Sequence, residues 1–401
     1  MKKISRRSFL KVSAVSAAAV SLAACGQSVG TTASSAAASS AAASTASSAA
    51  ADALKIGYVY IGDESEAYTA NFIAAEEAVK AEYGDKVSTI AKYNVAEDAV
   101  ESPLRELCEA GCGLVFTTSF GYGETTKEIA AEYPDIQFCQ ATCADASDDV
   151  PNYHNAMGTI YQGRYVSGIV AGMKLAELGV AAPKIGYVGA YPYAEVISGY
   201  TAFFLGVRSI VADATMEVMY ANSWGDYDTE KSMATAMIED GCSLISQHSD
   251  TKGPAVACKE STDAGKPVYC VCYNVDMIDV APQSCLISSR IDWALYQIET
   301  VSSVMSGEAL PLDNWHGFDD GWVAMTDLNT EIAAAGTQDA IDKAIADFKA
   351  GSIDVFKGNY TGTNYEGKTI DLNAGYTENE KQSAPAFDYV LDNVITVVST
   401  N

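Results

Sequence analysis

Histidine is scarce in this sequence, with only His154, His248 and His316 among 401 residues. None of them falls in an HExxH or another spacing at which histidines share a metal, and no CxxC pair is present. A GxSxG sequence occurs only at residues 26–30 (GQSVG), inside a Ser/Ala-rich segment, and a GxxxxGKT sequence only at residues 362–369 (GTNYEGKT), where no helix-period pattern follows. Neither stands between a predicted strand and a predicted helix, as the serine-hydrolase turn and the phosphate-binding loop require. We therefore predict no metal, no cofactor and no catalytic residues.

Basic residues are also in short supply. The chain has 25 Lys and Arg against 52 Asp and Glu, a net charge of −27. Five of the basic residues and none of the acidic ones lie in residues 1–25, so loss of that segment would leave a net charge of −32. A surface this acidic repels nucleic acid and anionic headgroups. Small molecules and proteins are the predicted partners, and nucleic acid is not.

The N-terminal region has the features of an export signal. Residues 5–11 (SRRSFLK) resemble a twin-arginine motif, and the apolar run at 12–24 is too short to span a bilayer. Cys25 follows Leu-Ala-Ala, which resembles the site at which bacterial lipoproteins are cleaved and acylated. We predict a signal peptide at 1–25, lipidation of Cys25, and a location on the extracytoplasmic face of the cell membrane.

A low-complexity segment follows the predicted lipidation site. Residues 26–52 consist almost entirely of Ser, Ala, Gly and Thr, which cannot bury enough apolar surface to offset their ordering entropy. We predict a tether. The nine cysteines beyond Cys25 show no clear pairing pattern. Export favours disulfides, whereas the spacings favour small buried apolar residues, so their state stays open.

An internal repeat reveals the architecture. Residues 55–59 (KIGYV) recur without change at 184–188, residues 111–115 (GCGLV) resemble 241–245 (GCSLI), and residues 134–138 align with 267–271. The three pairs occur in the same order with nearly constant offsets, which indicates a duplicated unit.

Each repeated segment has the length and composition of a strand. Helix-period patterns lie between such segments, for example at 70–83, 124–133 and 229–240, and strands that alternate with helices specify a parallel sheet. We predict two doubly wound α/β lobes with a hinge and an interlobe cleft. The predicted ranges are 54–160 for the first lobe, completed by about 285–310, and 161–284 for the second, completed by about 311–401.

Ligands bind such sheets beyond the carboxyl ends of the strands, and a cleft between lobes is a common binding site. In the first lobe, the loop after the first strand ends at Tyr68, a predicted stacking residue; the acidic residues before it are equally suited to a helix start. The next predicted loop offers glycine and two aromatics, although a plain turn is the alternative. It contributes Ser119, Phe120, Gly121 and Tyr122.

Strand-end loops of the second lobe carry the same mixture of aromatic, amide and carboxylate side chains. The predicted ligand-binding residues there are Tyr193, Glu195, Trp224, Asp250 and Asp276. His248 lies in one of these loops, but a structural hydrogen-bonded histidine is the favoured interpretation. Aromatic faces with polar edges suit a flat ligand rich in nitrogen and oxygen.

Several segments together resemble one family of proteins. They are residues 116–122 (FTTSFGY), 161–165 (YQGRY), 192–196 (PYAEV), 222–224 (NSW), 240–242, 247–250 and 274–277 (NVDM). Over about residues 54–325 the chain resembles the basic membrane protein (Bmp) family of substrate-binding lipoproteins of ABC transporters. The resemblance implies a type I periplasmic-binding-protein fold, an ABC permease as partner, and a purine nucleoside or nucleobase as ligand.

The resemblance also bears on the site. The family's stacking aromatic falls on Tyr68, and Glu195, Trp224, Asp250 and Asp276 match positions around its cleft. Two departures stand out: the first loop is acidic and lacks the Gly-Phe/Trp pattern of relatives, and the lysine of nucleoside-binding members has no counterpart near 288–290. A free base is therefore as compatible with this sequence as a nucleoside is. A ligand-sensing lipoprotein and, without any supporting motif, a nucleoside hydrolase are the alternatives.

Overall fold

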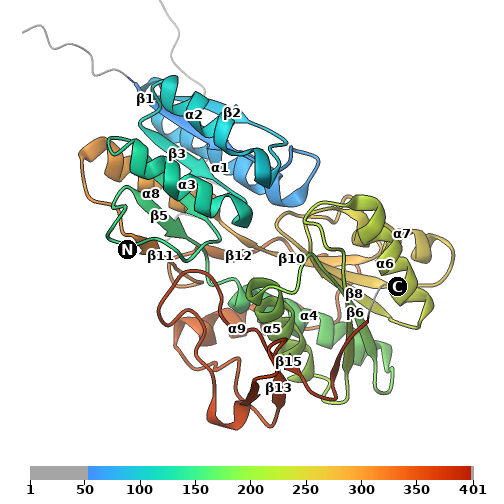
Figure 1. Cartoon of the computed structure of the whole chain (residues 1–401). Coiled ribbons are helices and arrows are strands. Elements are labelled where there is room, and N and C mark those ends of the chain that lie inside the picture. Colours follow the sequence, from blue (N-terminus) through green and yellow to red (C-terminus); the bar gives the residue numbers. More distant parts are fainter. Residues whose placement is uncertain (1–52, 399–401) are drawn as a thin grey trace, which may run out of the picture. The chain divides into compact units, whose positions relative to one another are not determined.

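The structure, a computed structural model, describes residues 53–398 (Figure 1). The strands are β1 (Leu54–Val59), β2 (Val87–Lys92), β3 (Leu114–Thr117), β4 (Gln137–Ala141), β5 (Tyr153–Ala156), β6 (Lys184–Gly189), β7 (Thr215–Tyr220), β8 (Leu244–His248), β9 (Tyr269–Tyr273), β10 (Cys285–Ile291), β11 (Asp313–Asn314), β12 (Val323–Met325), β13 (Thr361–Thr363), β14 (Thr369–Asp371), β15 (Val390–Leu391) and β16 (Ile395–Val397). The helices are α1 (Ala67–Tyr83), α2 (Glu101–Glu109), α3 (Gly123–Glu132), α4 (Tyr161–Leu178), α5 (Ala194–Arg208), α6 (Tyr227–Glu239), α7 (Gly253–Asp263), α8 (Trp293–Ser306) and α9 (Thr337–Lys349).

Two sheets form the framework of the two lobes, and their five repeated strands follow the same order. The first has the order β11-β5-β4-β3-β1-β2 and the second the order β12-β10-β9-β8-β6-β7-β16. Ile56 pairs with Leu114 in the first sheet as Ile185 pairs with Leu244 in the second, so the sequence repeat also preserves register. The predicted fold class, two doubly wound parallel-sheet lobes, is confirmed.

Helices cover both faces of each sheet because successive strand residues point to opposite sides. In β1, Tyr58 belongs to the same buried cluster as Phe72 of α1 and Trp293 of α8. The next residue, Val59, belongs instead to the cluster that contains Leu104 of α2. Strands that are buried on both faces read as near-continuous apolar runs, which explains why the repeated segments are so apolar.

The chain passes between the lobes at the β5–α4, β10–α8 and β11–β12 connections. These connections are hydrogen-bonded to one another. The Asp292 amide donates to the Trp322 carbonyl at 2.7 Å, and the Thr159 amide donates to the His316 carbonyl at 2.9 Å. Adjacent, mutually bonded connections are the arrangement expected of a hinge.

The structure corrects the predicted lobe boundaries. Residues about 285–310 were expected to complete the first lobe, but β10 lies in the second sheet, where it pairs in parallel with β9. Each lobe thus uses a fifth strand of its own, as β5 does beside β4, before the chain crosses. Only α8, which packs on α1, and the short strand β11 return to the first lobe.

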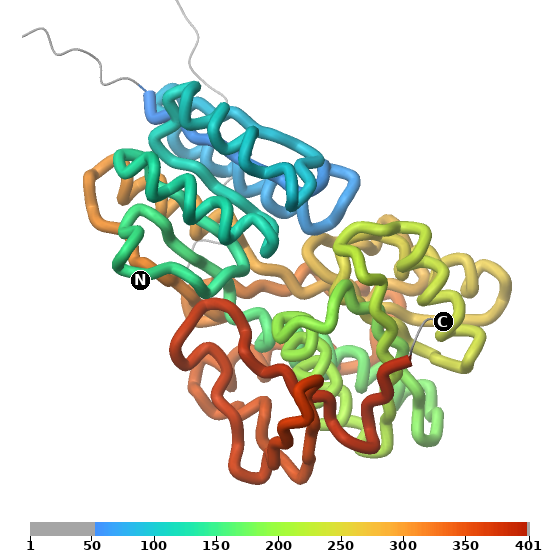
Figure 2. The backbone as a smooth tube through the Cα atoms, viewed as in Figure 1, coloured from blue at the N-terminus to red at the C-terminus, as the bar shows by residue number. Residues whose placement is uncertain are grey.

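The C-terminal region is built mainly on the second lobe. Helix α9 packs on α4, and β16 extends the second sheet beside β7 in parallel. Strands β13, β14 and β15 form a small antiparallel sheet between these elements. The red end of the chain in Figure 2 follows this course past the green elements of the second lobe.

The predicted signal peptide, Cys25 and the 26–52 tether lie outside the described residues. Within residues 53–398, no helix combines the length and apolar character needed to cross a membrane. The nine cysteines in this range are all buried, and none of them forms a disulfide in the structure.

Candidate ligand-binding site

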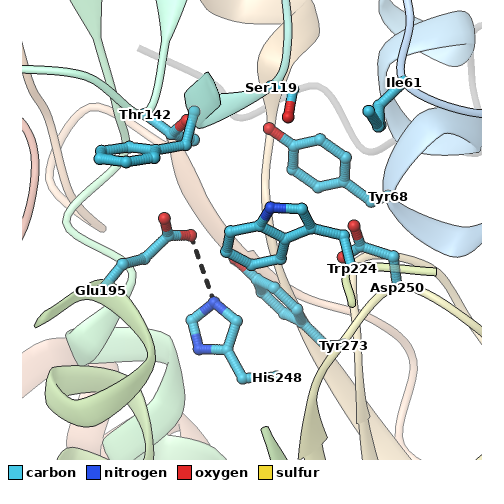
Figure 3. A pocket seen from close by; sticks show the side chains of 10 residues that line it. Ile61, Tyr68, Ser119, Thr142, Glu195, Trp224, His248, Asp250 and Tyr273 are labelled. Atoms are coloured by element: carbon cyan, nitrogen blue, oxygen red, sulfur yellow. Dashed lines mark hydrogen bonds and ion pairs between the residues drawn. The ribbon is translucent and has the colours of Figure 1, made fainter. Parts of the chain in front are cut away.

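A cavity of about 320 Å³ lies where strand ends of the two lobes face each other (Figure 3). Its lining comes from the ends of β8 and β9, from loops that follow β1, β3, β4, β7 and β8, and from the first turns of α1 and α5. The lining residues are Ile61, Tyr68, Ser119, Phe120 and Thr142 from the first lobe, and Glu195, Trp224, His248, Asp250 and Tyr273 from the second.

Tyr68 occupies the first turn of α1. Its hydroxyl donates to the Thr118 carbonyl at 2.5 Å, and its ring meets Phe72 edge-on with centroids 5.0 Å apart. Burial, followed by the nearby Glu195 and Asp250, raises the pKa of Tyr68 well above its usual 10. The phenol therefore stays protonated and its ring is held in one orientation, beside Trp224 in Figure 3.

Glu97 fixes the loop after β3. Its carboxylate accepts from the Ser119 hydroxyl at 2.6 Å and from the Gly121 amide at 3.0 Å. These bonds hold the 3₁₀ turn Phe120–Tyr122. Phe120 remains 47% exposed, and its ring lies 5.4 Å from that of Tyr193 in the other lobe. Aromatic side chains of both lobes therefore meet at the edge of the cavity.

Thr142, the residue after β4, has an unusual backbone. Its φ angle is 65°, and a β-branched residue in this region is strained. Its buried hydroxyl lines the cavity but has no hydrogen-bond partner in the structure. A strained residue with an unpaired polar group at a cavity is a candidate ligand contact.

Glu195 and His248 form a hydrogen-bonded pair, with 3.3 Å between Oε1 and Nε2. Burial, and then Arg164, lowers the pKa of His248 well below 6.5, so the imidazole is neutral. Its Nε2–H donates to Glu195 when that carboxylate is ionised. Burial raises the pKa of Glu195 to about 7, and Arg164 offsets part of that rise. Glu195 can therefore change its protonation state near neutral pH.

Asp250 is the second carboxylate of the cavity. Burial and the neighbouring Glu230 raise its pKa well above 3.8, and Arg164 opposes the rise. Within the described range, the carboxylate receives no hydrogen bond from protein. The Arg164 guanidinium lies 3.5 Å from the centre of the Tyr273 ring, and its Nη1 donates to the Gln247 carbonyl at 2.8 Å. The buried Arg164 side chain thus contacts the Tyr273 ring and the Gln247 carbonyl, and its positive charge acts on both Glu195 and Asp250.

Comparison with known proteins decides the family. The sequence profile described as Bmp, ABC transporter substrate-binding protein PnrA-like, matches residues 61–353. The chain belongs to this family. The profile of the twin-arginine translocation signal matches residues 3–23, which confirms the predicted export signal.

Relatives of this Bmp-family protein carry different ligand names. A purine-binding protein of Brucella abortus (strain 2308) is 34% identical over 276 residues, 68% of this chain and 75% of the relative. A Haloferax volcanii protein with the provisional name of ABC transporter glucose-binding protein is 30% identical over 308 residues, 75% of each chain. Basic membrane protein A2 of Borrelia garinii is 21% identical over 57% of this chain and 66% of its own length.

Solved structures bear on the fold. An ABC transporter solute-binding protein from Aeropyrum pernix K1 superposes with a TM-score of 0.66 at 14% identity, covering 75% of this chain and 92% of its own. One from Conexibacter woesei gives a TM-score of 0.60 at 17% identity, covering 75% and 98%. The type I periplasmic-binding-protein fold expected from the sequence is thereby confirmed.

Six of the ten predicted binding residues of this Bmp-family protein line the cavity. They are Tyr68, Ser119, Phe120, Glu195, Trp224 and Asp250. Tyr193 lies just outside the lining, at the edge of the cavity, where its ring stacks on Tyr191 at 5.0 Å and approaches Phe120. It remains in contact with a lining residue, and its role in ligand binding stays a prediction.

The other three predicted residues lie outside the lining and have structural roles. Gly121 binds Glu97 through its amide, and an added Cβ there would collide with that carboxylate. Tyr122 is fully buried in the core, where its hydroxyl donates to the Val95 carbonyl at 2.5 Å. Asp276 is exposed and accepts from the Ile278 amide in a turn. We therefore no longer assign these three residues to the ligand.

Four lining residues were not predicted: Ile61, Thr142, His248 and Tyr273. His248 was interpreted as a structural histidine, and it both binds Glu195 and lines the cavity. Tyr273 is the last residue of β9, and the loop after that strand was predicted to border the site, so its position at the strand end could have identified it as a lining residue. Thr142 offered none, because its hydroxyl reaches the cavity through a backbone conformation that the sequence does not reveal.

Three thiols outside the cavity come close enough to be considered for a metal. Those of Cys270, Cys272 and Cys285 lie within 4.8 Å of one another, with Cys272 and Cys285 3.8 Å apart. Metal ligation would require thiolates. The thiols are buried in an apolar cluster with Met, Ile, Val and Ala side chains, an environment that disfavours the charge of several thiolates. We assign them to core packing.

Proposed function

We propose that this chain is an extracytoplasmic substrate-binding lipoprotein of an ABC importer, and that its ligand is a purine nucleoside or nucleobase held in the interlobe cavity. The observation that carries the proposal is the pairing of aromatic residues from both lobes, Tyr68 and Trp224, with the carboxylates of Glu195 and Asp250. Rings can cover the faces of a planar ligand while carboxylates accept hydrogen bonds from its edges.

The charges of the cavity favour a particular ligand chemistry. An ionised carboxylate only accepts hydrogen bonds, whereas a protonated carboxyl group also donates one. Burial raises the pKa of both Glu195 and Asp250, so the pair suits a neutral ligand whose edges carry N–H or O–H donors beside acceptors. Arg164 lies near both groups, and once they ionise its charge is already balanced, which disfavours an anionic ligand. Purine bases and nucleosides are uncharged, planar and rich in such donors, and nucleotides carry the phosphate charge that the cavity opposes.

One relative also supports the proposal. The Brucella abortus relative, at 34% identity, is named as purine-binding.

A sugar is the second candidate. The Haloferax volcanii relative is provisionally named as glucose-binding, and aromatic faces with carboxylates can also bind sugar rings through hydroxyl donors. The purine is favoured because two aromatic side chains from opposite lobes, Tyr68 and Trp224, line the same cavity. A sugar presents hydroxyls on most of its edges and would find few partners on the first-lobe wall.

Calorimetric titration distinguishes the two candidates. The fragment beginning at residue 53 is titrated with adenine, hypoxanthine, guanine, their nucleosides and glucose. We expect micromolar or tighter binding of at least one purine and none of glucose. Recovery of the bound compound unchanged, as shown by mass spectrometry, would support a receptor over a nucleoside hydrolase. If no purine binds measurably, or if glucose alone binds tightly, the purine proposal is wrong.

The lipid anchor is part of the same proposal. Cys25 follows Leu-Ala-Ala in the sequence, and the segment after it is long enough to separate the lobes from a membrane. Replacement Cys25→Ser in the full chain should release the protein from the membrane fraction, and labelled palmitate should enter only the wild-type chain. Equal membrane retention of both chains would contradict the anchor. Loss of purine uptake on gene deletion would separate import from ligand sensing.

A further inference from the structure

A segment outside the family match bridges the two lobes beside the cavity. Residues 376–388, which we call the C-terminal strap, begin 23 residues after the profile match ends at 353. The strap starts at Tyr376, which forms an isolated antiparallel β-bridge with Phe356 in the C-terminal region, and it contacts both lobes through buried polar groups. Buried polar groups of this kind normally have a structural purpose, because leaving them unpaired is costly.

Glu378 anchors the strap to the second lobe. Its side chain is buried and accepts from the Ser198 hydroxyl of α5 at 2.7 Å. It also accepts from the amides of Ala386 at 2.7 Å and Phe387 at 3.0 Å, which closes the strap into a loop. Phe387 is itself buried and stacks on Phe356 with ring centroids 4.5 Å apart. This end of the strap is therefore firmly fixed.

Ser383 ties the strap to the first lobe. Its side chain is 0% exposed; its amide donates to Oδ2 of Asp313 at 2.9 Å, and its hydroxyl donates to the Cys143 carbonyl at 3.3 Å. Asn379 holds Ser383 in place, because its Nδ2 donates to the Ser383 carbonyl at 2.6 Å. Ser383 thus joins the strap to β11 and to the loop after β4.

The carbonyl that Ser383 binds belongs to the residue directly after Thr142. Cys143 also reaches Phe120, since its thiol donates to the Phe120 carbonyl at 3.4 Å. Thr142 combines a strained φ of 65° with an unpaired hydroxyl at the cavity. Strain of this kind persists only when the surroundings fix the backbone, and the bond from Ser383 is one of the contacts that do so.

We propose that the C-terminal strap is a positioning element of the ligand site: through Ser383 and Cys143 it holds the Thr142 hydroxyl toward the ligand and restrains the first lobe against the second. The inference rests on the proposed function, because Thr142 is taken to hydrogen-bond the purine. Thr142 is the ligand contact in this scheme, and Ser383 acts only through it.

The test severs the strap from the first lobe in the folded fragment. The double variant Ser383→Ala/Asp313→Ala removes both bonds. Thr361→Ala is the matched control, because its hydroxyl binds only Asp392 within the C-terminal region. Two readouts are used: affinity for the purine that binds most tightly in the calorimetric panel, and hydrogen exchange of the amides in residues 142–146. The exchange readout does not require a ligand.

We expect the double variant to bind at least fivefold more weakly, the equivalent of about one hydrogen bond, and to exchange faster at 142–146, while Thr361→Ala matches the wild type. Thr142→Val should also bind at least fivefold more weakly. Adding the strap changes to Thr142→Val should reduce affinity less than twofold further, because both act on the same hydroxyl.

Unchanged exchange at 142–146 in the double variant overturns the inference, whether or not a purine binds. Fully additive losses with Thr142→Val overturn it as well, since the strap would then act elsewhere. If no purine binds the wild-type fragment but exchange at 142–146 rises, the purine proposal fails while the strap contact to this loop stands.

Discussion

The two walls of the cavity come from lobes with the same topology, yet their chemistry differs. The first-lobe wall has no ionisable carboxylate or imidazole: it consists of Ile61, Tyr68, Ser119, Phe120 and Thr142. The second-lobe wall carries Glu195, His248 and Asp250, with Arg164 close by. Equivalent strand ends therefore bear different side chains: the loop after β1 leads to Tyr68, and the loop after the matching strand β6 leads to Glu195.

This difference teaches that the duplication preserved the fold and not the site. A closing lobe can cover a ligand with neutral aromatic and hydroxyl groups without adding buried charge, whereas the carboxylates recognise the donors of the ligand. We infer that selectivity resides mainly in the second lobe. Changes to the carboxylates of that wall should therefore reduce affinity more than changes to aromatic residues of either wall, and the predictions below test this ranking.

The largest effect is expected from Asp250. The described residues offer its carboxylate no hydrogen bond, so a ligand donor is its natural partner. We expect Asp250→Ala to weaken purine binding about 100-fold, or about 3 kcal/mol, because the ligand group that pairs with Asp250 would be left buried without a partner. Calorimetry measures the loss. Asp276→Ala is the matched control, because Asp276 is exposed in a turn and should bind the purine as the wild type does. Equal losses for the two variants would contradict the assignment.

A pH titration gives the next largest effect. The pKa of Glu195 is about 7, so its ionised fraction falls about 30-fold from pH 8.5 to pH 5.5. If the ligand donates to the carboxylate, affinity should fall by about the same factor over that range. Glu195→Gln removes the titration and should give a flatter profile. A wild-type profile as flat as that of the variant would show that the ligand does not depend on ionised Glu195.

Without ligand, the same group affects stability with the opposite sign. The folded pKa of Glu195, about 7, lies above its usual 4.5, so between these values the folded state retains a proton that the unfolded state has lost. The stability of the wild type relative to Glu195→Gln should therefore fall as pH rises from about 4.5 to 7 and change little above it. Denaturation midpoints of the two proteins across this range measure the difference.

The fold was largely predictable, and the site only in part. The repeat at 55–59 and 184–188 revealed the two lobes because parallel strands buried on both faces must be apolar, and such runs are visible in a sequence. The lobe crossing at Asp292 was misplaced because nothing local distinguishes a strand that stays in its lobe from one that leaves. Strand-end loops were located correctly, but whether a side chain enters the cavity depends on backbone turns. Thr142 was not predicted and lines the cavity, whereas Tyr122 was predicted and lies in the core.

Trp224 also tests the comparison between the two cavity walls, because it is an aromatic residue on the second-lobe wall, which carries the charged groups. Its indole lies near Tyr191 and Tyr193 at centroid distances of 5.3 and 6.1 Å and is only partly buried. We expect Trp224→Ala to weaken purine binding about tenfold, about 1.4 kcal/mol, while the melting temperature of the ligand-free protein stays nearly unchanged. Tyr68→Ala should weaken binding to a similar extent. A large drop in melting temperature for either variant would identify that side chain as core.

The smallest effect on binding is expected from Tyr122, although its loop borders the cavity. Its ring lies in the core and its hydroxyl donates to the Val95 carbonyl, so Tyr122→Phe deletes a buried hydrogen bond without touching the cavity. The variant should lose about 1 kcal/mol of unfolding free energy and bind the purine with unchanged affinity. Chemical denaturation and calorimetry on the same preparation separate the two. Weakened binding at full stability would show that the first-lobe wall extends beyond Phe120 and that the contrast between the walls is smaller than the cavity lining indicates.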